Sequence, residues 1–363
     1  MMLRITTIVG ARPQFVKAAV ISRVIREPFR DRVSEFLIHT GQHYDENMSD
    51  VFFRDMEIPQ PDLNLQIGSG SHGETTGKML IGIEAALLAN RPDLLLVYGD
   101  TNSTLAGALA ASKLHIPVAH VEAGLRSFNR QMPEEQNRIV TDHLSRVLLC
   151  PTSAAVKNLA REGVVEGENG YRVFRTGDVM LDASLFYRER VANRSGGIVS
   201  TLGLSGDFFL LTMHRAENTD DPRRLRAIWE GVSSSEIPGV FPVHPRTRKV
   251  IEQIGLRPAK NITLIDPVGY HDMIELESSC RFIVTDSGGV QKEAYFFGKP
   301  CITLRDQTEW VETVEAGWNV LAGADSTTIS QAMKRPIAPK EQPPLYGDGN
   351  SGREIVQAIL TAL

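Results

Sequence analysis

The sequence predicts an α/β protein built from two doubly wound, Rossmann-like domains, each with a mostly parallel β-sheet. Three observations lead to this prediction. The chain has 363 residues, whereas a single hydrophobic core usually stops growing at roughly 250–300 residues. Short apolar runs of strand length alternate with longer stretches of helical spacing, which is typical of repeated βα units. Polar residues follow many of these runs, at the end where parallel sheets bind their ligands.

Residues 1–166 form the first predicted domain. Its strands are expected at 3–9, 34–39, 94–98, 117–121 and 147–150, with helices such as 74–88 and 101–113 between them. A Gly- and Glu-rich stretch, 162–170, should connect it to the second domain. The last helix, residues 351–363, is expected to pack back on the first domain.

Residues 167–350 form the second predicted domain. A short strand at 171–175 is expected to begin it. The strands that follow are expected near 208–213, 239–243, 262–265, 281–285, 300–304 and 319–321. The Pro-rich stretch 336–344 should then carry the chain away from this domain.

The composition and charge of the chain argue against several classes of function. The formal net charge of −5 argues against nucleic acid or an anionic membrane surface as the main partner, because both need a basic footprint. No apolar run approaches the ~18 residues of a spanning helix, and the start of the chain lacks the pattern of a signal peptide. We therefore expect a cytoplasmic protein.

Cys150, Cys280 and Cys301 are widely spaced, and their spacing is not that of metal ligands. We therefore expect buried, reduced thiols and no metal site.

The turn after the first strand carries two cations. Arg12 and Lys17 lie about one helical turn apart in Gly10-Ala11-Arg12-Pro13-Gln14-Phe15-Val16-Lys17. Helix N-terminal amides together with such charges can bind a diphosphate. The alternative is a basic first turn that only faces solvent.

Carboxylates follow the next strands of the first domain. Asp100 and Glu122 come directly after predicted strands, and Glu134 and Glu135 open a helix. Alternatively, Asp100 caps the helix that starts at Thr101, and the two glutamates only complement a helix dipole. Several carboxylates at one rim would suit acid/base chemistry on a weakly acidic carbon.

The second domain also carries polar residues directly after its strands, at the carboxyl edge of its predicted sheet. These residues are His214, His244 and the turn Ser287-Gly288-Gly289. The glycine turn opens a helix whose amides could approach a phosphate closely, and Glu293, one turn later, could accept ribose hydroxyls. The alternative is a Gly-Gly turn that closes a βα unit for steric reasons.

The stretch 68–73, in the first domain, formally matches a dinucleotide fingerprint. No strong strand precedes it, so no nicotinamide cofactor is expected.

Assembled, these residues resemble the non-hydrolysing UDP-N-acetylglucosamine 2-epimerase family over nearly the whole chain. The matching stretches are Gly10-Ala11-Arg12-Pro13, Tyr98-Gly99-Asp100-Thr101, His120-Val121-Glu122-Ala123-Gly124-Leu125-Arg126, Pro133-Glu134-Glu135 through Arg138, His214-Arg215, and Thr285-Asp286-Ser287-Gly288-Gly289-Val290-Gln291 through Glu293. The resemblance implies a glycosyltransferase-B-like arrangement with the active site in a cleft between the domains. It also implies cofactor-free elimination and re-addition of UDP, with inversion at carbon 2.

The resemblance also implies roles for individual residues. Asp100, Glu122 and Glu134 would be the acid/base groups, with His214 as an auxiliary catalytic or phosphate-contacting residue. The expected substrate contacts are Arg12, Lys17, Gln42, His43, Arg138, Ser287, Gly288, Gly289 and Glu293. A homodimer and a place in polysaccharide biosynthesis are further expectations.

The chain departs from the commonest family pattern at three places. Ala11 and Gln14 stand where Thr and Glu are frequent, and the segment 307–312 carries Trp310 where Arg is frequent. The last change resembles the branch that acts on UDP-2,3-diacetamido-2,3-dideoxyglucuronic acid, so this sugar competes with UDP-N-acetylglucosamine as the expected substrate. Two different function classes also stay open, a UDP-sugar glycosyltransferase and a non-catalytic nucleotide-binding protein.

Overall fold

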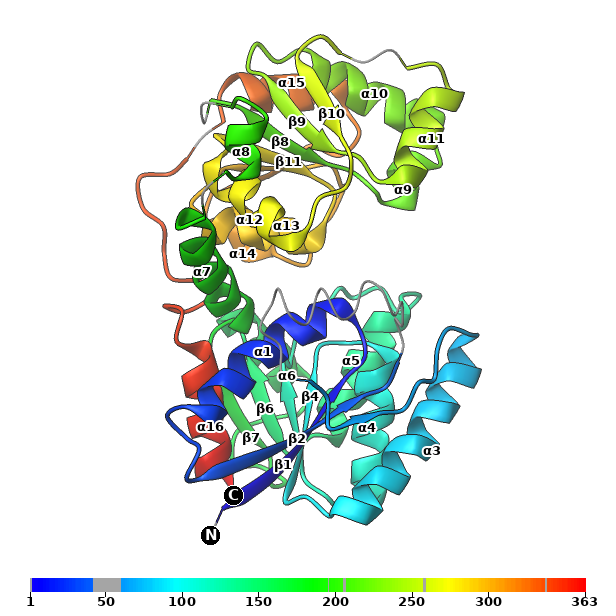
Figure 1. Ribbon diagram of the computed structural model, residues 1–363, viewed down its shortest axis with the longest axis vertical. Helices are drawn as coiled ribbons and strands as arrows, with labels where there is room; N and C mark the ends of the chain where they lie inside the picture. The colour runs from blue at the N-terminus through cyan, green and yellow to red at the C-terminus, as the bar shows by residue number, and fades with distance from the viewer. Residues whose placement is uncertain (1, 42–59, 195, 205–206, 257–258, 337) are drawn as a thin grey trace. The chain divides into compact units, whose positions relative to one another are not determined.

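A computed structural model describes residues 2–41, 60–194, 196–204, 207–256, 259–336 and 338–363. The chain folds as two compact units (Figure 1). Met1–Ala183 and Pro344–Leu363 form the first unit, and Ser184–Pro343 forms the second. Both are layered α/β structures with a parallel sheet. The predicted fold class, two Rossmann-like domains, is confirmed.

The first unit contains a seven-stranded sheet in the order β3-β2-β1-β4-β5-β6-β7. All its strand pairs are parallel. The strands are β1 (Leu3–Val9), β2 (Val33–His39), β3 (Leu63–Asn64), β4 (Leu94–Tyr98), β5 (Val118–Val121), β6 (Val147–Cys150) and β7 (Arg172–Arg175). The helices are α1 (Arg12–Arg26), α3 (His72–Asn90), α4 (Asn102–Lys113), α5 (Pro133–Leu144), α6 (Ser153–Arg161), α7 (Val179–Ala192), which runs on into the second unit, and α16 (Ser351–Ala362).

The central strand β4 shows why this sheet forms. All five of its residues, from Leu94 to Tyr98, are fully buried. A parallel strand covered by helices on both faces needs such a continuous apolar run rather than an alternating one. On α4, small residues such as Ala106 and Ala110 allow the helix to pack closely on the sheet. Thr101 caps α4, because its hydroxyl accepts a hydrogen bond from the Thr104 amide at 3.3 Å.

The strand expected to begin the second domain belongs instead to the first sheet. β7 pairs in parallel with β6 from Val147↔Arg172 to Cys150↔Arg175. The expected boundary at 166/167 therefore falls ahead of the last strand of the first sheet. The apolar pattern predicted the strand correctly. It could not predict which sheet the strand joins, because that is decided by the pairing with β6, which a local pattern does not contain.

Helix α16 returns the end of the chain to the first unit. The amides of Ser351 and Gly352 donate to the Asp182 carboxylate at 3.1 and 2.8 Å. A Cβ on Gly352 would lie 2.8 Å from a methyl group of Val20, so α16 packs very closely against α1.

The second unit contains a six-stranded sheet in the order β10-β9-β8-β11-β12-β13, again all parallel. The strands are β8 (Phe209–Thr212), β9 (Gly239–Pro242), β10 (Ile262–Ile265), β11 (Phe282–Thr285), β12 (Cys301–Thr303) and β13 (Asn319–Leu321). The helices are α8 (Ile198–Thr201), α9 (Ala216–Thr219), α10 (Pro222–Ser233), α11 (Pro245–Gln253), α12 (Tyr270–Ser279), α13 (Gly288–Phe296), α14 (Val311–Glu315) and α15 (Ser326–Lys334). This strand order is the Rossmann order.

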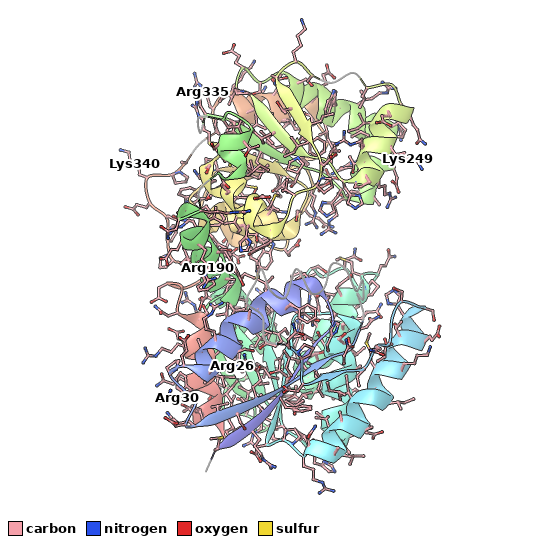
Figure 2. All side chains as sticks on the ribbon, viewed as in Figure 1. Arg26, Arg30, Arg190, Lys249, Arg335 and Lys340 are labelled. Carbon is pink, nitrogen blue, oxygen red and sulfur yellow. The ribbon has the colours of Figure 1, made fainter. Side chains whose placement is uncertain are left out.

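Several arginine and lysine side chains lie on the outside of each unit (Figure 2). Arg26 and Arg30 on the first unit, and Lys249 and Arg335 on the second, are labelled there. The three cysteines are buried and are not joined in disulfides. Within the described residues, no helix is long and apolar enough to cross a membrane.

Candidate functional site

The rim of the first unit lies at the carboxyl ends of β1, β4 and β5. The buried side chain of Gln14 holds this rim together. Its amide oxygen accepts from the Gly10 and Ala11 amides at 2.8 and 3.0 Å, and its amide nitrogen donates to the Tyr98 carbonyl at 2.8 Å and to the Thr104 hydroxyl at 2.9 Å. Because both ends of its side-chain amide are satisfied, Gln14 fixes the first turn to the end of β4.

Lys17 and Glu122 form a buried ion pair at this rim. The ammonium group of Lys17 contacts a carboxylate oxygen of Glu122, and both side chains are buried. Glu122 follows β5 directly and has a positive φ of 68°. Such a backbone conformation is strained for a non-glycine residue and is often found at functional sites.

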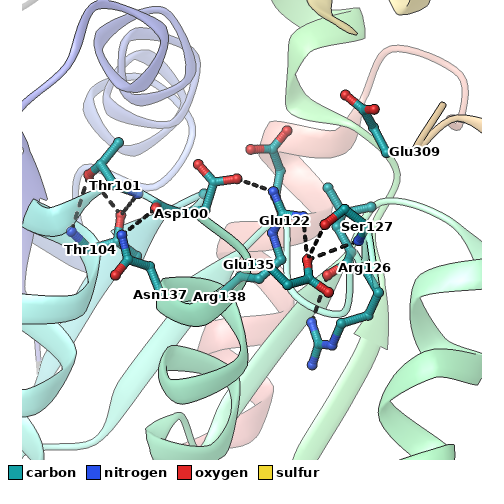
Figure 3. Close-up of polar contacts among 12 residues, drawn as sticks. Asp100, Thr101, Thr104, Glu122, Arg126, Ser127, Glu135, Asn137, Arg138 and Glu309 are labelled. Carbon is teal, nitrogen blue, oxygen red and sulfur yellow. Dashed lines mark hydrogen bonds and ion pairs between the residues drawn. The ribbon is translucent and has the colours of Figure 1, made fainter. Parts of the chain in front are cut away.

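Asp100 belongs to a second ion pair, with Arg138 (Figure 3). Tyr98 lies opposite Val121 in the pairing of β4 with β5, so Asp100 and Glu122 emerge from neighbouring strand ends. Arg138 also donates to Glu135 at 2.9 Å. Glu135 in turn accepts from the amides of Ser127 and Phe128, each at 2.9 Å. Asp100 therefore does not cap α4, and Arg138 is held in place between two carboxylates.

The two neighbouring glutamates of α5 have different environments. Glu135 is buried, whereas Glu134 is exposed in the first turn of the helix. Among the described residues, Glu134 makes no hydrogen bond or ion pair. Its proposed catalytic role thus rests on the resemblance alone, while Glu135, which was not among the expected site residues, positions Arg138.

A buried charged network underlies this rim. The Asp142 carboxylate accepts from His120 Nδ1 at 2.7 Å, from Arg126 Nη1 at 2.7 Å and from the Gly124 amide at 3.1 Å. The other ring nitrogen of His120 contacts the Gly99 carbonyl at 2.7 Å. His120 therefore bridges the Asp142 carboxylate and the Gly99 carbonyl. The network therefore fixes the backbone just before Asp100 and just after Glu122.

Charge compensation keeps this network ionised. Burial alone would raise the pKa of Asp142, but the charges and hydrogen bonds of His120 and Arg126 outweigh it and lower the pKa. Arg126 also forms a bidentate salt bridge with Glu162, with Nε and Nη2 each 2.7 Å from a carboxylate oxygen. The arginine of the Glu122–Arg126 motif is thus a structural residue buried beneath the rim.

In the second unit the buried carboxylate of Asp286 holds a loop in place, as Asp142 does in the first unit. Asp286 follows β11 and is fully buried. It accepts from the amides of His214 and Arg215 at 3.1 and 3.0 Å, and from Asn218 Nδ2 at 3.2 Å. His214 Nδ1 lies 3.4 Å from the same carboxylate, while half of the His214 side chain is exposed. Asp286 thus fixes the turn that presents His214.

The turn Ser287-Gly288-Gly289 lies at the N-terminus of α13, as expected. The Ser287 hydroxyl caps the helix by accepting from the Val290 amide at 3.5 Å. A Cβ on Gly289 would have only Ser287 Oγ and Glu293 Oε2 nearby, at 3.9 and 4.0 Å. The backbone at Gly289 is therefore not crowded by the side chains of Ser287 and Glu293.

Glu277 lies on α12, which contacts α13. Its side chain is fully buried, and among the described residues neither carboxyl oxygen has a hydrogen-bond partner. Burial, and then the charge of Glu293, raise the pKa of Glu277 well above its ordinary value. Glu277 therefore keeps its proton at higher pH than a solvent-exposed glutamate does.

Three of the predicted contacts lie outside the described part of the chain. These are the residues Gln42 and His43 and the side chain of Arg12. Sequence reasoning named Glu135 only as one of two acids that open a helix, and it missed Asp142, although the spacing of Glu135, Arg138 and Asp142 at i, i+3 and i+7 places all three on one helical face. Across the described ranges, no three His, Cys, Asp or Glu side chains come together as a metal site.

Comparison with known proteins assigns the family. The family model described as UDP-N-acetylglucosamine 2-epimerase matches residues 28–360. The chain belongs to this family. The resemblance seen in the motifs is thereby confirmed, and it extends over nearly the whole chain.

Several family members are similar over their full length. The UDP-2,3-diacetamido-2,3-dideoxy-D-glucuronate 2-epimerase of Pseudomonas aeruginosa is 51% identical, over 98% of this chain and 99% of the relative. A UDP-N-acetylglucosamine 2-epimerase homolog of Methanococcus maripaludis is 50% identical, over 98% and 99%. The crystal structure of Methanocaldococcus jannaschii UDP-GlcNAc 2-epimerase, in complex with UDP-GlcNAc and UDP, is 44% identical with a TM-score of 0.85, covering 99% of each chain.

Glu277 should make the stability of this family member depend on pH. Because the pKa of Glu277 is raised on folding, the folded state holds a proton that the unfolded state has released. The free energy of unfolding should therefore fall, relative to that of Glu277→Gln, as the pH rises above the ordinary glutamate pKa, by up to about 1.4 kcal/mol per pH unit. Denaturant unfolding at several pH values measures this difference, with the exposed Glu252→Gln as control. Parallel curves for wild type and Glu277→Gln would contradict a raised pKa of Glu277.

Proposed function

We propose that the chain interconverts the two carbon-2 epimers of a UDP-linked 2-acetamido sugar, without a nicotinamide cofactor. The observation that carries this proposal is the pair of carboxylates at neighbouring strand ends, each held by a cation: Asp100 by Arg138 and Glu122 by Lys17. Inversion at one carbon needs a proton to leave one face and return to the other, and therefore needs more than one positioned proton-transfer group.

The proposed reaction has two steps. In the first, a carboxylate takes the proton from carbon 2 while the bond between carbon 1 and the UDP oxygen breaks, which leaves a 2-acetamidoglucal and UDP. In the second, the UDP oxygen re-forms the bond to carbon 1, and a carboxylic acid returns a proton to the opposite face of carbon 2. Atoms and electrons balance without an oxidant. Asp100, Glu122 and Glu134 are the proposed acid/base groups.

The nucleotide is proposed to bind the second unit. The Ser287-Gly288-Gly289 turn suits phosphate oxygens because its helix-end amides point outward, and Glu293 suits the ribose hydroxyls. His214, presented by Asp286, would assist the departure of the diphosphate. The sequence predicts that Lys17 binds the diphosphate, but its buried contact with Glu122 favours a role in holding that carboxylate. The expected cleft between the domains stays a prediction.

Two substrates are supported by different relatives. UDP-N-acetylglucosamine, with UDP-N-acetylmannosamine as product, is the substrate class of the family and of the 44% identical M. jannaschii protein by its name. UDP-2,3-diacetamido-2,3-dideoxyglucuronate is favoured by the 51% identical P. aeruginosa relative. Trp310 agrees with the second substrate.

The function is tested by proton NMR of each UDP-sugar with the purified protein in D₂O, without added cofactor. We expect the carbon-2 epimer to form with deuterium at carbon 2. Asp100→Asn and Glu122→Gln should each lower the rate by about 10²-fold or more, while the exposed control Glu168→Gln should not. Epimer without deuterium, or no epimer from either sugar, would contradict the proposal, and transfer to an added acceptor would favour a glycosyltransferase.

A homodimer is proposed from an exposed apolar face on α3. Ile81 and Leu88 lie seven residues apart on this helix, with 69% and 50% of their surfaces exposed. A second copy of the chain would cover them. Light scattering of the purified protein should give twice the monomer mass, and a monomer mass at micromolar concentration would contradict the proposal. The cytoplasmic location and the role in polysaccharide biosynthesis stay predictions.

A further inference from the structure

The glycine turn of the second unit needs a positive charge near it. The cations expected for the diphosphate, Arg12 and Lys17, both belong to the first unit, and Lys17 contacts Glu122. Helix-end amides alone favour an anion by only about 0.3–1 kcal/mol at exposed positions. A diphosphate at Ser287-Gly288-Gly289 therefore calls for a cation from the second unit itself.

Arg305 emerges beside this turn. Thr285 at the end of β11 lies opposite Thr303 at the end of β12 in the parallel pairing. Ser287 and Arg305 each follow two residues later, and the Leu304 amide donates to the Thr285 carbonyl at 2.8 Å. Because neighbouring strands are only about 4.8 Å apart, Arg305 starts from the same rim as the turn.

Glu309 connects Arg305 to the turn. One carboxylate oxygen of Glu309 accepts from Arg305 Nη1 at 3.0 Å. The other lies so close to Gly288 that a Cβ there would be only 2.4 Å away. The guanidinium group is therefore held next to the N-terminus of α13.

Two further contacts fix the segment that carries Glu309. The Thr308 hydroxyl donates to Gln291 Oε1 at 2.7 Å, and the ring of Trp310 lies under Lys292 Nζ, 4.3 Å from its centroid. Both partners belong to α13. The position where Trp310 replaces the frequent arginine is thus occupied by an aromatic ring that carries a lysine from the neighbouring helix.

The two glycines of the turn serve different purposes. Gly288 leaves room for Glu309, whereas Gly289 faces the open space beside Ser287 and Glu293. Glu309 consequently lies on the Gly288 side of the turn and leaves the Gly289 side clear.

Arg305 has donors left for a ligand. A guanidinium carries five N–H donors, and over the described ranges one hydrogen bond of Arg305, the one to Glu309, is formed. Its side chain is 12% exposed, and none of its nitrogen atoms is among the buried atoms that lack a partner. The remaining donors are therefore directed at accessible space.

We propose that Arg305 is the second unit's binding residue for the diphosphate of the nucleotide, and that Glu309 is the positioning residue that holds it at the turn. This inference rests on the proposed function. The fork of an arginine suits two phosphate oxygens at once, which a lysine at this position would not match.

The test compares binding of uridine, UMP and UDP by calorimetry at fixed low salt. Arg305→Gln should weaken UDP binding by about tenfold or more, leave uridine binding unchanged, and affect UMP to a smaller extent. Arg281→Gln is the matched control, because Arg281 lies at the opposite end of β11 and pairs with Asp207 at 3.1 Å. Arg305→Lys should fall between wild type and Arg305→Gln.

Glu309 is tested in the same titrations. Glu309→Ala should weaken UDP binding, and Glu309→Gln, which keeps an oxygen for Arg305, should restore it. Wild-type UDP affinity in Arg305→Gln, or an equal loss of uridine and UDP affinity, would overturn the inference. So would a wild-type protein that binds uridine as tightly as UDP. A protein that binds UDP as expected but forms no epimer would contradict the proposed function and leave the role of Arg305 supported.

Discussion

The buried carboxylate of Asp142 is the constraint on which the first unit's rim depends. It receives donors from His120 on β5, from Arg126 and from the Gly124 amide. Removing one partner of such a buried pair typically costs about 3–5 kcal/mol, because the other charge is left uncompensated. Through His120 the network reaches the Gly99 carbonyl. The backbone on either side of the proposed catalytic carboxylates is therefore held by one charged group.

The second unit uses the same physical device. Asp286, fully buried, accepts from the two amides that precede α9 and from Asn218. In both units an acidic side chain without access to solvent holds loops at the carboxyl ends of parallel strands, where ligands of such sheets bind. His214 and Asp100, which are proposed to meet the substrate, are more exposed than Asp286 and Arg138, which hold them. Glu122 is the exception, because it is as buried as its partner Lys17.

Much of the fold could be predicted from the sequence, because buried parallel strands such as Leu94–Tyr98 are continuous apolar runs. The pattern could not say which sheet the strand at 172–175 joins, since that is decided by pairing with β6. Among the site residues, Asp100 and Glu122 could be found because they follow strands directly. Glu134 and Glu135 are identical neighbours, and only the rotation of α5 decides which is buried. The contact of Lys17 with Glu122 could not be predicted, because the two residues lie 105 positions apart in the chain.

The dependence of the rim on the buried charge of Asp142 is tested most directly by the turnover rate of Asp142→Asn, determined together with its melting temperature and its affinity for UDP. Asparagine keeps the size of the side chain and one acceptor but removes the charge that joins His120 to Arg126. We expect a folded protein that binds UDP through its second unit yet has lost most of its epimerisation rate. A folded Asp142→Asn protein with the wild-type rate would show that the rim does not depend on this buried charge.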